Sequence, residues 1–577
     1  MIGGLAELPS YTGLVTMLSV GLAGNGASPN RYRIAALELG SSRVQVVVAP
    51  GVEASGQDFQ AFSQALLTKG LKIEVSGALV VDGELLKKLI EVAEGRVSAV
   101  GDGLAAKNKQ ISEAKTLFMS WLENAVQVGA TDIHLLPVSS ERGAVLFRVD
   151  GELEPYRGER GHVYALQEMT QAGAWPFTSV VAKRSNSSST FESSLDQFCM
   201  TEPIQTADGK VVLRYQSLHG LHGPKIVCRI LHNDVSRPSM TFGDMGYEVS
   251  QQRILAAAQH VESGMIIVAG VTGSGKTTML KSFVEFHPSN PPEGPTAAFL
   301  SIEDPPEYDM RGVHRTPVQR DPADPESGRR SFNGIAAAVV RQDPDIVIVG
   351  EMRDEPSASL AMQLTETGHG AYATLHAHLL AGIPPRLTNK EIGLSRDSLT
   401  NPNTLTLLVY QALVPKLCPH CKMTSISALA AAEAFDRVDP ATRFSAYHLK
   451  DIYKRLEGDF NLGMERFFFK NPEGCSHCGG RGTKGVTVVA EMFMPDRTWL
   501  ELIRNGQDRE AELYFRAGVD RSGNAGWDSD EMSGKTVFEH TLLKALRGQV
   551  DVRQCERFSP FSQFEVNPQF KPSMIRR

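Results

Sequence analysis

A glycine-rich segment, residues 270–277, constrains the fold of this chain more than any other part of its sequence. It reads Gly-Val-Thr-Gly-Ser-Gly-Lys-Thr and directly follows the apolar run 265–269. After it, Met279 and Phe283 have the spacing of one helical face. A strand, this turn and a helix form a P-loop, in which backbone amides surround phosphate oxygens at a helix N-terminus. The segment therefore predicts an α/β domain that binds a nucleoside triphosphate.

The individual P-loop residues have predicted tasks in holding ATP and Mg²⁺. The ammonium of Lys276 should bridge the β- and γ-phosphates, and the hydroxyl of Thr277 should bind Mg²⁺. A glycine-rich turn that binds nothing is the alternative, but the strand and helix on either side disfavour it. The predicted nucleotide-binding residues are Gly270, Val271, Thr272, Gly273, Ser274, Gly275, Lys276, Thr277, Thr278 and Asp304.

Acidic residues follow two further apolar runs of the same domain. Glu303 and Asp304 come directly after the run 299–302. Glu351 follows the run 346–349 in the same way, with one glycine between. Because ligands of parallel sheets collect at the carboxyl ends of the strands, these side chains should face the nucleotide. We predict that Glu351 and Glu303 arrange the attacking water and the cation, and either of them could be the general base.

Two histidines flank a short strand-like segment, residues 370–373, with His369 before it and His376 after it. A single histidine is more often an ordinary core or surface residue than a catalyst. Here both belong to a segment that a doubly wound sheet would place beside the nucleotide-binding strands. We therefore predict that His369 senses the γ-phosphate or couples the strands, and we rank His376 second.

Four of the seven cysteines form two Cys-x-x-Cys pairs. These four are Cys418, Cys421, Cys475 and Cys478. Four thiolates match a tetrahedral Zn²⁺ site without an open position, so the predicted zinc is structural. His420 and His477 lie inside the pairs and could substitute as ligands, although we expect them to face solvent. A redox pair of dithiols is the competing interpretation. The remaining cysteines, Cys199, Cys228 and Cys555, are expected to be ordinary buried thiols.

Composition places the chain among multidomain globular proteins. It has 577 residues, enough for about four domains, and its net charge of −7 comes from 59 basic and 66 acidic residues. This balance gives no support for binding nucleic acid. No apolar run approaches the roughly 18 residues needed to cross a bilayer. Residues 11–27 lack the preceding basic residues of a signal peptide, so we expect a cytosolic protein.

The pattern along the chain predicts six segments. Residues 1–95 alternate a strand-like run with amphipathic helices, which fits a small α/β or α+β module. Residues 96–110, with their Gly, Ala and Lys, predict a linker. Strand-like runs and the turn dipeptide Asp150-Gly151 predict an α+β domain over residues 111–240. The predicted segments after it are a P-loop core (241–417), a tetracysteine zinc module (418–495) and a helical region (496–577).

Taken together, these motifs resemble those of the secretion ATPase superfamily, and specifically those of the type II secretion and type IV pilus assembly ATPases. The resemblance covers roughly residues 111–500. Its motifs are Ala-Thr-Asp-Ile-His at 130–134, Phe-Arg-Val-Asp-Gly at 147–151, the P-loop, an aspartate box at 303–307, a Walker B segment at 341–354, a histidine box at 367–376 and the tetracysteine module.

The resemblance implies a fold, a function and partners. The expected fold is a P-loop NTPase (RecA-like) α/β domain preceded by an α+β (PAS-like) domain, with a small N-terminal docking module and a tetracysteine zinc insertion. The expected function is that of a hexameric cytoplasmic ATPase that couples ATP hydrolysis to pilus assembly or type II-like secretion. The expected partners are further copies in a homo-hexamer, an inner-membrane platform protein and a cytoplasmic or membrane docking protein, with no nucleic acid. The chain would then be peripheral to the inner membrane.

In this family, arginines of the domain before the P-loop approach the nucleotide, and Arg214 and Arg229 match those positions. An arginine that reaches the γ-phosphate can accelerate hydrolysis by roughly 10³ to 10⁵. The alternative is that both arginines only form ion pairs on their sheet. The predicted catalytic residues are Lys276, Glu351, Glu303, Arg214, Arg229 and His369.

Three other functions compete with this interpretation. A pilus retraction motor is the nearest, although retraction motors generally lack the long N-terminal module and the tetracysteine insertion. A nucleic-acid motor such as a helicase or DNA translocase would need a basic channel or stacking aromatics, and neither is apparent in the sequence. A scaffold that binds nucleotide only for stability would not need the full set of candidate catalytic residues.

Overall fold

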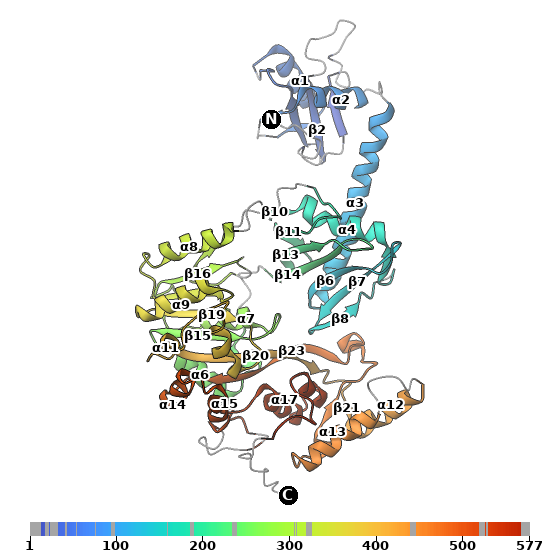
Figure 1. Cartoon of the computed structure of the whole chain (residues 1–577). Helices are drawn as coiled ribbons and strands as arrows, with labels where there is room; N and C mark the ends of the chain where they lie inside the picture. The colour runs from blue at the N-terminus through green and yellow to red at the C-terminus, as the bar shows by residue number, and fades with distance from the viewer. Residues whose placement is uncertain are drawn as a thin grey trace. The chain divides into compact units, whose positions relative to one another are not determined.

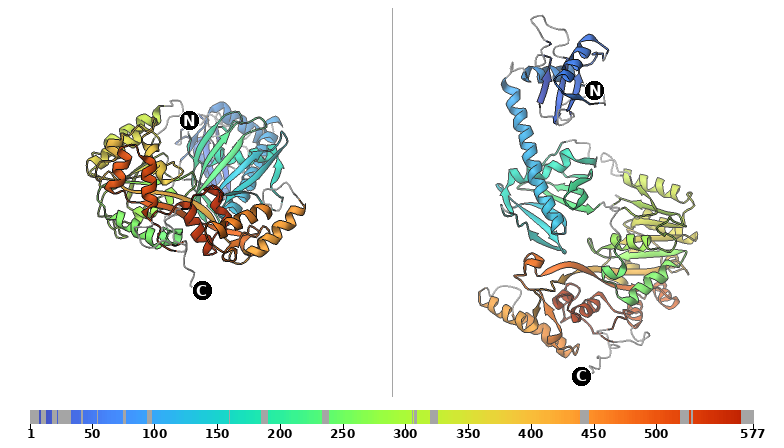
Figure 2. Two further views of the ribbon diagram at one scale, coloured as in Figure 1. Left: turned by 60° about the horizontal axis from the view of Figure 1, so that its bottom comes forward. Right: turned by 180° about the vertical axis from the view of Figure 1, so that it is seen from behind.

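The computed structural model divides the chain into two compact units, Met1–Thr116 and Leu117–Arg577. Figures 1 and 2 show the elements of both units. Among the described residues, no helix combines the length and the apolar composition that a bilayer crossing requires. The described residues are 8, 13–17, 22, 33–40, 43–53, 55–74, 77–93, 98–158, 160–184, 190–232, 239–304, 306, 309–318, 326–438, 446–518, 526 and 529–566.

The first unit contains a small sheet with one helix on each face. Its elements are β1 (Gly13–Thr16), β2 (Ile34–Gly40), β3 (Arg43–Val48), α1 (Gln57–Thr68), β4 (Lys72–Ile73), β5 (Leu79–Val80) and α2 (Gly83–Ala93). The strands pair in the order β1-β2-β3-β4, with β5 also beside β3. Val46 packs in the core with Phe62 of α1, whereas Val47 packs in the core with Leu86 of α2. Successive strand residues point to opposite faces, so apolar runs such as β3 can serve both cores.

Most residues of the predicted linker are helical. One continuous helix, α3 (Ser98–Gln127), includes most of the segment 96–110 and continues past the boundary between the two units. The glycines of this segment suggested a break, but an isolated glycine costs a helix interior only about 1 kcal/mol. The Ala, Leu, Lys and Gln residues around them are good helix formers. The boundary between the two units therefore falls within this helix, after Thr116.

The second unit begins with the predicted α+β domain. Its elements after α3 are β6 (Ala130–Pro137), β7 (Arg142–Val149), β8 (Glu152–Pro155), β9 (Val163–Ala165), α4 (Leu166–Ser179), β10 (Val181–Arg184), β11 (Gln197–Thr201), β12 (Ile204–Thr206), β13 (Gly209–Leu218) and β14 (Lys225–His232). The main sheet has the order β10-β11-β13-β14-β6-β7-β8 and is antiparallel. Trp121 of α3 and Phe177 of α4 are buried in the same core as inward-facing strand residues such as Leu213. Two helices thus cover one face of an antiparallel sheet.

The P-loop domain is built on a seven-stranded mixed sheet. Its elements up to the sixth strand are α5 (Phe242–Met245), α6 (Val249–Gln259), β15 (Gly264–Ala269), α7 (Lys276–Glu285), β16 (Phe299–Glu303), β17 (Val313–Pro317), α8 (Ser327–Val339), β18 (Ile346–Glu351), α9 (Glu355–Glu366), β19 (Gly370–Leu375), η2 (Leu380–Gly382), α10 (Ile383–Leu387), α11 (Arg396–Leu399) and β20 (Leu405–Leu417). The strand order is β17-β16-β18-β19-β15-β20-β23, and only β23 (Thr483–Phe493) runs antiparallel to its neighbour.

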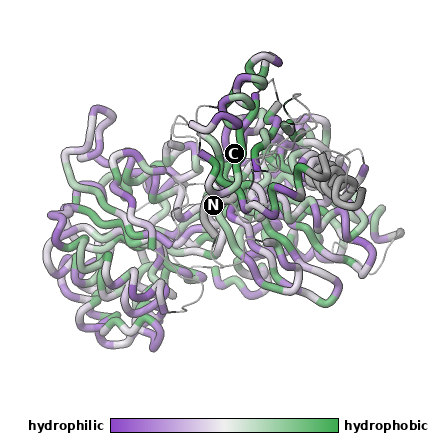
Figure 3. Tube along the Cα trace, turned by 90° about the horizontal axis from the view of Figure 1, so that it is seen from above, coloured by the Kyte–Doolittle hydropathy of each residue, from purple (hydrophilic) through white to green (hydrophobic). Residues whose placement is uncertain are grey.

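Apolar side chains fill both faces of this sheet. Ile266 belongs to the core that includes Leu255 of α6 and Phe283 of α7, whereas Ile267 belongs to the core that includes Leu360 of α9. The hydropathy-coloured trace shows these apolar strands between more polar helices and loops (Figure 3). A sheet covered on both faces leaves only its edges accessible, so ligands have to bind where strands end.

The rest of the chain belongs partly to an insertion and partly to the same core. Its elements are β21 (Met423–Thr424), α12 (Ser425–Val438), α13 (Ala446–Gly458), η3 (Met464–Arg466), β22 (Phe468–Phe469), η4 (Ser476–Cys478), then β23, α14 (Arg497–Arg504), α15 (Asp508–Arg516), α17 (Val537–Leu546) and η5 (Val552–Arg557).

The predicted boundaries of the last two segments differ from the structure. Strand β23 lies inside the predicted cysteine module of 418–495, but it pairs with β20 at the end of the P-loop domain's sheet. Helix α17 lies in the predicted separate region of 496–577, but its residues Phe538 and Leu542 belong to the core on the α9 face. Apolar runs, rather than the positions of the cysteines, determine which residues join a sheet, so the insertion ends before β23.

Candidate active site

The P-loop connects β15 to α7 at the carboxyl end of the parallel strands. Gly275 caps α7 with a φ of 82°, a conformation that favours glycine. Gly270 has no room for a side chain, because a Cβ there would lie 2.4 Å from Ser274 Oγ and 2.5 Å from Gln411 O. The loop is a tight backbone cradle whose outer residues, such as Val271, are exposed. These features fit the predicted phosphate site.

The side chain of Lys276 lies over this cradle. Its Nζ donates hydrogen bonds to the carbonyl oxygens of Gly270 at 2.8 Å and Val271 at 3.0 Å. Thr277 follows in the first turn of α7 and is partly exposed. The loop therefore brings a positive charge, a hydroxyl and a helix N-terminus together, which is the set of groups that a triphosphate with Mg²⁺ requires.

Glu351 lies at the end of β18, which β19 separates from the P-loop strand β15. Its carboxylate contacts His376 Nε2 at 3.0 Å and an Arg353 guanidinium nitrogen at 2.6 Å, and 19% of its side chain is exposed. His376 follows β19, the strand that pairs with both β18 and β15. The structure thus brings Lys276, Glu351 and His376 together at the carboxyl ends of the parallel strands β15, β18 and β19.

His376 is a neutral imidazole at physiological pH. Burial and the positive charge of Lys276 lower its pKa, against the opposite effect of Glu351. A neutral imidazole has one donor and one acceptor nitrogen, so His376 can hold the Glu351 carboxylate without adding charge to the site.

His369 lies at the other end of these strands, where β19 and β15 begin. It directly precedes β19, and its carbonyl accepts the amide of Gly264 at the beginning of β15. The P-loop follows the other end of β15, about 20 Å away for a six-residue strand. His376, and not His369, therefore lies at the P-loop end of these strands, and the predicted γ-phosphate-sensing or strand-coupling role of His369 stays a prediction. The sequence could have distinguished the two histidines, because only His376 follows its strand and so lies at the carboxyl end, where the P-loop is.

Glu303 is held in an ion pair rather than left facing a cation. It lies at the end of β16 with 7% of its side chain exposed, and Arg315 of β17 donates to both carboxylate oxygens at 3.0 and 2.8 Å. Ser301 also donates to this carboxylate at 2.7 Å. Asp304 follows and is partly buried. Glu307, the last residue of the predicted aspartate box, is outside the described residues.

The two predicted arginines of the α+β domain are neighbours on its sheet. Arg214 of β13 and Arg229 of β14 are directly paired across the strands. Arg229 donates to Asp132 of β6 at 3.0 Å, and the Arg214 guanidinium lies 5.9 Å from the Phe198 ring centre. Arg229 therefore takes part in the ion pair that the sequence left open as an alternative.

The four predicted cysteines converge. Among the described residues, Cys418, Cys421, Cys475 and Cys478 are the group whose ligand atoms all lie within 4.8 Å of one another. Three of their Sγ–Sγ distances are 3.7, 3.9 and 3.8 Å. A tetrahedron with Zn–S bonds of about 2.3 Å has edges of about 3.8 Å, so the sulfur positions fit Zn²⁺.

The surroundings of the thiols also favour metal binding. Cys478 Sγ accepts the amides of Cys475 at 3.2 Å and Gly482 at 3.1 Å. Although burial acts in the opposite direction, these amides and the neighbouring thiols lower the pKa of Cys478 to about 6. His420 and His477 are exposed, as predicted, and their rings lie 4.1 Å apart. The cysteines predicted to be ordinary buried thiols are buried, namely Cys199, Cys228 and Cys555.

Sequence patterns gave no signal for several residues that shape this site. Arg315 and Arg353, which bind the two glutamates, have no predicted role, although Arg353 lies within the Walker B segment. Gln411, in the neighbouring strand β20, donates to the P-loop carbonyl of Ser274 at 2.7 Å. An isolated glutamine in an apolar strand has no recognisable motif, so only the structure connects it to the P-loop.

Comparisons with known proteins show which family the chain resembles. The profile of the Type II/IV secretion system protein family matches residues 107–542. A type IV pilus assembly ATPase of Acinetobacter baylyi is 30% identical over 392 residues, which are 66% of this chain and 57% of that protein. A putative type II secretion system protein E of Escherichia coli is 27% identical over 327 residues, 55% of this chain and 58% of that protein. The chain thus spans somewhat more than half the length of these relatives.

Among solved structures, a pilus retraction motor with bound ADP is similar with a TM-score of 0.45. It is 18% identical in sequence, and the match covers 77% of this chain and 96% of that chain.

Proposed function

Because the chain belongs to the Type II/IV secretion system protein family, we propose that it is a hexameric ATPase motor for type IV pilus assembly or type II-like secretion. The observation that carries this proposal is that the P-loop, Glu351 and His376 lie together at the carboxyl ends of the parallel strands. A P-loop alone supports nucleotide binding, whereas an adjoining carboxylate also supports hydrolysis.

In the proposed reaction, the P-loop amides and Lys276 hold the β- and γ-phosphates of ATP. Thr277 would hold Mg²⁺, which would neutralise charge on these phosphates. Glu351 would orient a water molecule for in-line attack on the γ-phosphorus and accept its proton. The bond from this phosphorus to the bridging oxygen breaks, and ADP and phosphate leave.

Glu351 is the better candidate for the general base of the two glutamates. Both oxygens of Glu303 accept from Arg315, and its side chain is nearly buried. Glu351 is more exposed, and its ion pair is with Arg353, whose side chain is 55% exposed, against 16% for Arg315. We therefore assign Glu303 to fixing the end of β16, and Glu351 to the water.

His376 would sense the γ-phosphate through its two neighbours. A phosphate bound to Lys276 would reduce the positive charge that lowers the pKa of His376. It would also compete for the proton that His376 shares with Glu351. The loss of the γ-phosphate would restore the present contacts, so this pair reports which nucleotide is bound.

Arg214 and Arg229 would close over the nucleotide when the α+β domain moves. Arg229 would have to exchange its contact with Asp132 for the γ-phosphate, which exchanges one negative partner for another. Closure on ATP and opening after hydrolysis would convert phosphate chemistry into a stroke.

The tetracysteine group would hold a structural Zn²⁺. Four sulfur ligands leave no open position, so this metal would stabilise the fold of the insertion and take no part in hydrolysis. The amides that donate to Cys478 favour the thiolate that zinc requires.

The chain would act as a homo-hexamer at the cytoplasmic face of the inner membrane, against a platform protein, with the N-terminal unit binding a docking protein. Deletion of the gene should abolish pili or secretion, and a Glu351→Gln copy should fail to restore them. Hyperpiliation after deletion would instead identify a retraction motor, and unchanged filaments and secretion would refute both roles.

A further inference from the structure

The P-loop is supported by one residue of the neighbouring strand, Gln411 of β20. Its side chain is fully buried, and its Nε2 donates to the Ser274 carbonyl at 2.7 Å. Its own backbone carbonyl lies against Gly270, where a Cβ would approach it to 2.5 Å. Gln411 therefore supports the P-loop backbone at its first glycine and again at Ser274.

The amide group of Gln411 has a fixed orientation because of Tyr247. The Tyr247 hydroxyl donates to Gln411 Oε1, and the tyrosine is itself buried. Burial raises the pKa of Tyr247 far above physiological pH, so its hydroxyl is always a donor. With its oxygen occupied by this donor, the amide must direct its NH₂ group toward Ser274. Without Tyr247, the amide could turn its oxygen toward the Ser274 carbonyl and lose the contact.

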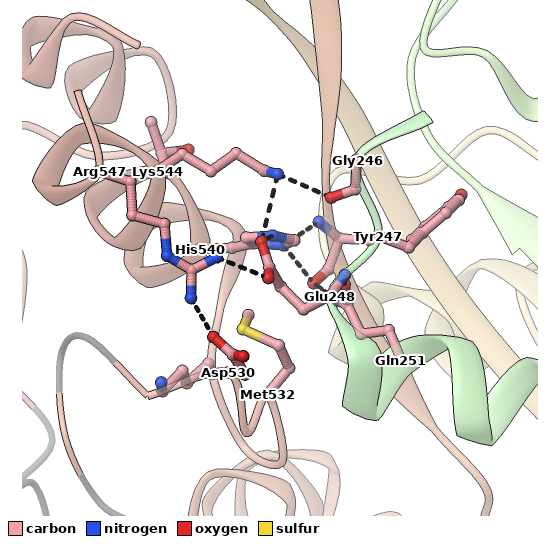
Figure 4. Close-up of polar contacts among 12 residues, drawn as sticks. Gly246, Tyr247, Glu248, Gln251, Asp530, Met532, His540, Lys544 and Arg547 are labelled. Carbon is pink, nitrogen blue, oxygen red and sulfur yellow. Dashed lines mark hydrogen bonds and ion pairs between the residues drawn. The ribbon is translucent and has the colours of Figure 1, made fainter. Parts of the chain in front are cut away.

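The neighbours of Tyr247 are fixed to the C-terminal helix α17 (Figure 4). Lys544 Nζ donates to the Gly246 carbonyl at 2.7 Å, and the Glu248 carboxylate lies 2.8 Å from Arg547 and 3.4 Å from Lys544. Gly246 is also packed tightly against β23, since a Cβ there would lie 2.0 Å from Thr487 Oγ1. Tyr247 thus lies between two residues that α17 holds in place.

We propose that Tyr247 is a positioning residue for the P-loop, acting through Gln411, and that its position makes the phosphate grip depend on α17. The inference rests on the proposed function, because it concerns the nucleotide grip of the same site. Residues 239–248 are the first described residues after β14, so this junction stands between the α+β domain and the P-loop domain in the chain. A displacement of this junction would be transmitted to Ser274 through the hydrogen bonds from Tyr247 to Gln411 and from Gln411 to Ser274.

Two conservative variants of the full chain test the proposal. Tyr247→Phe removes only the hydroxyl that orients Gln411. Tyr372→Phe is the matched control. Tyr372 is a buried tyrosine of β19, the neighbour of β15 on the side away from β20, and its hydroxyl has no hydrogen-bond partner among the described residues. The first readout is hydrogen exchange of the P-loop amides without nucleotide. The second is calorimetric binding of a non-hydrolysable ATP analogue with Mg²⁺, and the third is the KM and kcat for ATP.

We expect Tyr247→Phe to speed exchange of the P-loop amides and to weaken analogue binding about three- to tenfold. KM should rise by a similar factor with little change in kcat, and Tyr372→Phe should match the parental chain. In a Gln411→Leu background, Tyr247→Phe should have no further effect on binding, because the two residues act as one unit.

Unchanged exchange and affinity in Tyr247→Phe would overturn the proposal, as would an undiminished effect in the Gln411→Leu background. Exchange is measured without nucleotide, so it decides on the positioning role independently of catalysis. A parental chain that binds no ATP analogue would instead refute the proposed function, while its exchange data would still test the link from Tyr247 to the P-loop.

Discussion

His540 gives the P-loop domain a pH-dependent stability of definite sign. It is fully buried in α17, with Nδ1 accepting the Ala490 amide at 3.0 Å and Nε2 lying 3.4 Å from the Glu248 carboxylate. Lys544 and Arg547 face the same carboxylate (Figure 4). Burial lowers the pKa of His540 to about 4, although Glu248 and the Ala490 backbone act in the opposite direction.

The sign and size of the effect follow from the two pKa values. An unfolded histidine titrates near its ordinary value of 6.5. The folded pKa is the lower one, so the unfolded chain binds the extra proton and stability is lost as the pH falls from 6.5 toward 4. Between pH 7.5 and pH 5.5 this single site should cost about 1.3 kcal/mol. Glu248 stays ionised throughout, because His540 and Lys544 hold its pKa well below its usual range against the effect of burial.

Glu491 produces the opposite dependence in the same core. It is buried in β23, where it accepts the amides of Leu380 at 2.9 Å and Val537 at 3.1 Å, with Arg516 and Glu539 nearby. Burial raises its pKa from 4.5 to about 7. A raised folded pKa gives stability that is complete below pH 4.5 and is lost as the pH rises through 7. Going from pH 7.5 to pH 5.5 should therefore add about 1.8 kcal/mol.

Native-state hydrogen exchange of the α17 and β23 amides measures both effects in this region. The free energies of opening at pH 7.5 and pH 5.5 are compared for the parental chain, His540→Gln and Glu491→Gln. The parental chain should change little, because the two effects nearly cancel. Glu491→Gln should lose about 1.3 kcal/mol on acidification, and His540→Gln should gain about 1.8 kcal/mol. Parallel changes in all three proteins would refute the reasoning.

Three further predictions concern the candidate site and the cysteines. Glu351→Gln should reduce phosphate release at least about 100-fold while calorimetry still detects ATP binding; a parental rate would exclude the assigned role. His376→Ala should reduce hydrolysis about tenfold or more, whereas His369→Ala should stay within about twofold of the parental rate; the reverse pattern would contradict their placement at opposite ends of β19. Metal analysis should find one Zn²⁺ per chain and none in Cys478→Ser, and a chelator should lower the melting temperature; a metal-free folded parental chain would contradict this site.

Much of the site was predictable because the decisive groups follow recognisable strands. The P-loop and Glu351 each come directly after an apolar run, and parallel pairing brings such positions to one sheet edge. The two Cys-x-x-Cys pairs were equally readable, since four thiolates have few other arrangements. In each case the residue type and the local spacing already fix the geometry.

Other features depend on contacts between distant segments. The carboxylate of Glu303 is neutralised by Arg315 across two strands, and no local pattern announces that pair. The P-loop support by Gln411 and Tyr247 joins residues that are 164 positions apart in the sequence. Strand β23 follows the cysteines in the sequence, whereas its partner β20 precedes them, so chain order alone places β23 with the cysteine module.

Phosphate release from ATP by the purified full chain with Mg²⁺, compared with Lys276→Ala, tests the central claim most directly. The account predicts Mg²⁺-dependent release that Lys276→Ala reduces at least about 100-fold, because Lys276 places its positive charge over the P-loop backbone. Equal rates for the two proteins, or a folded parental chain that releases no phosphate, would contradict it.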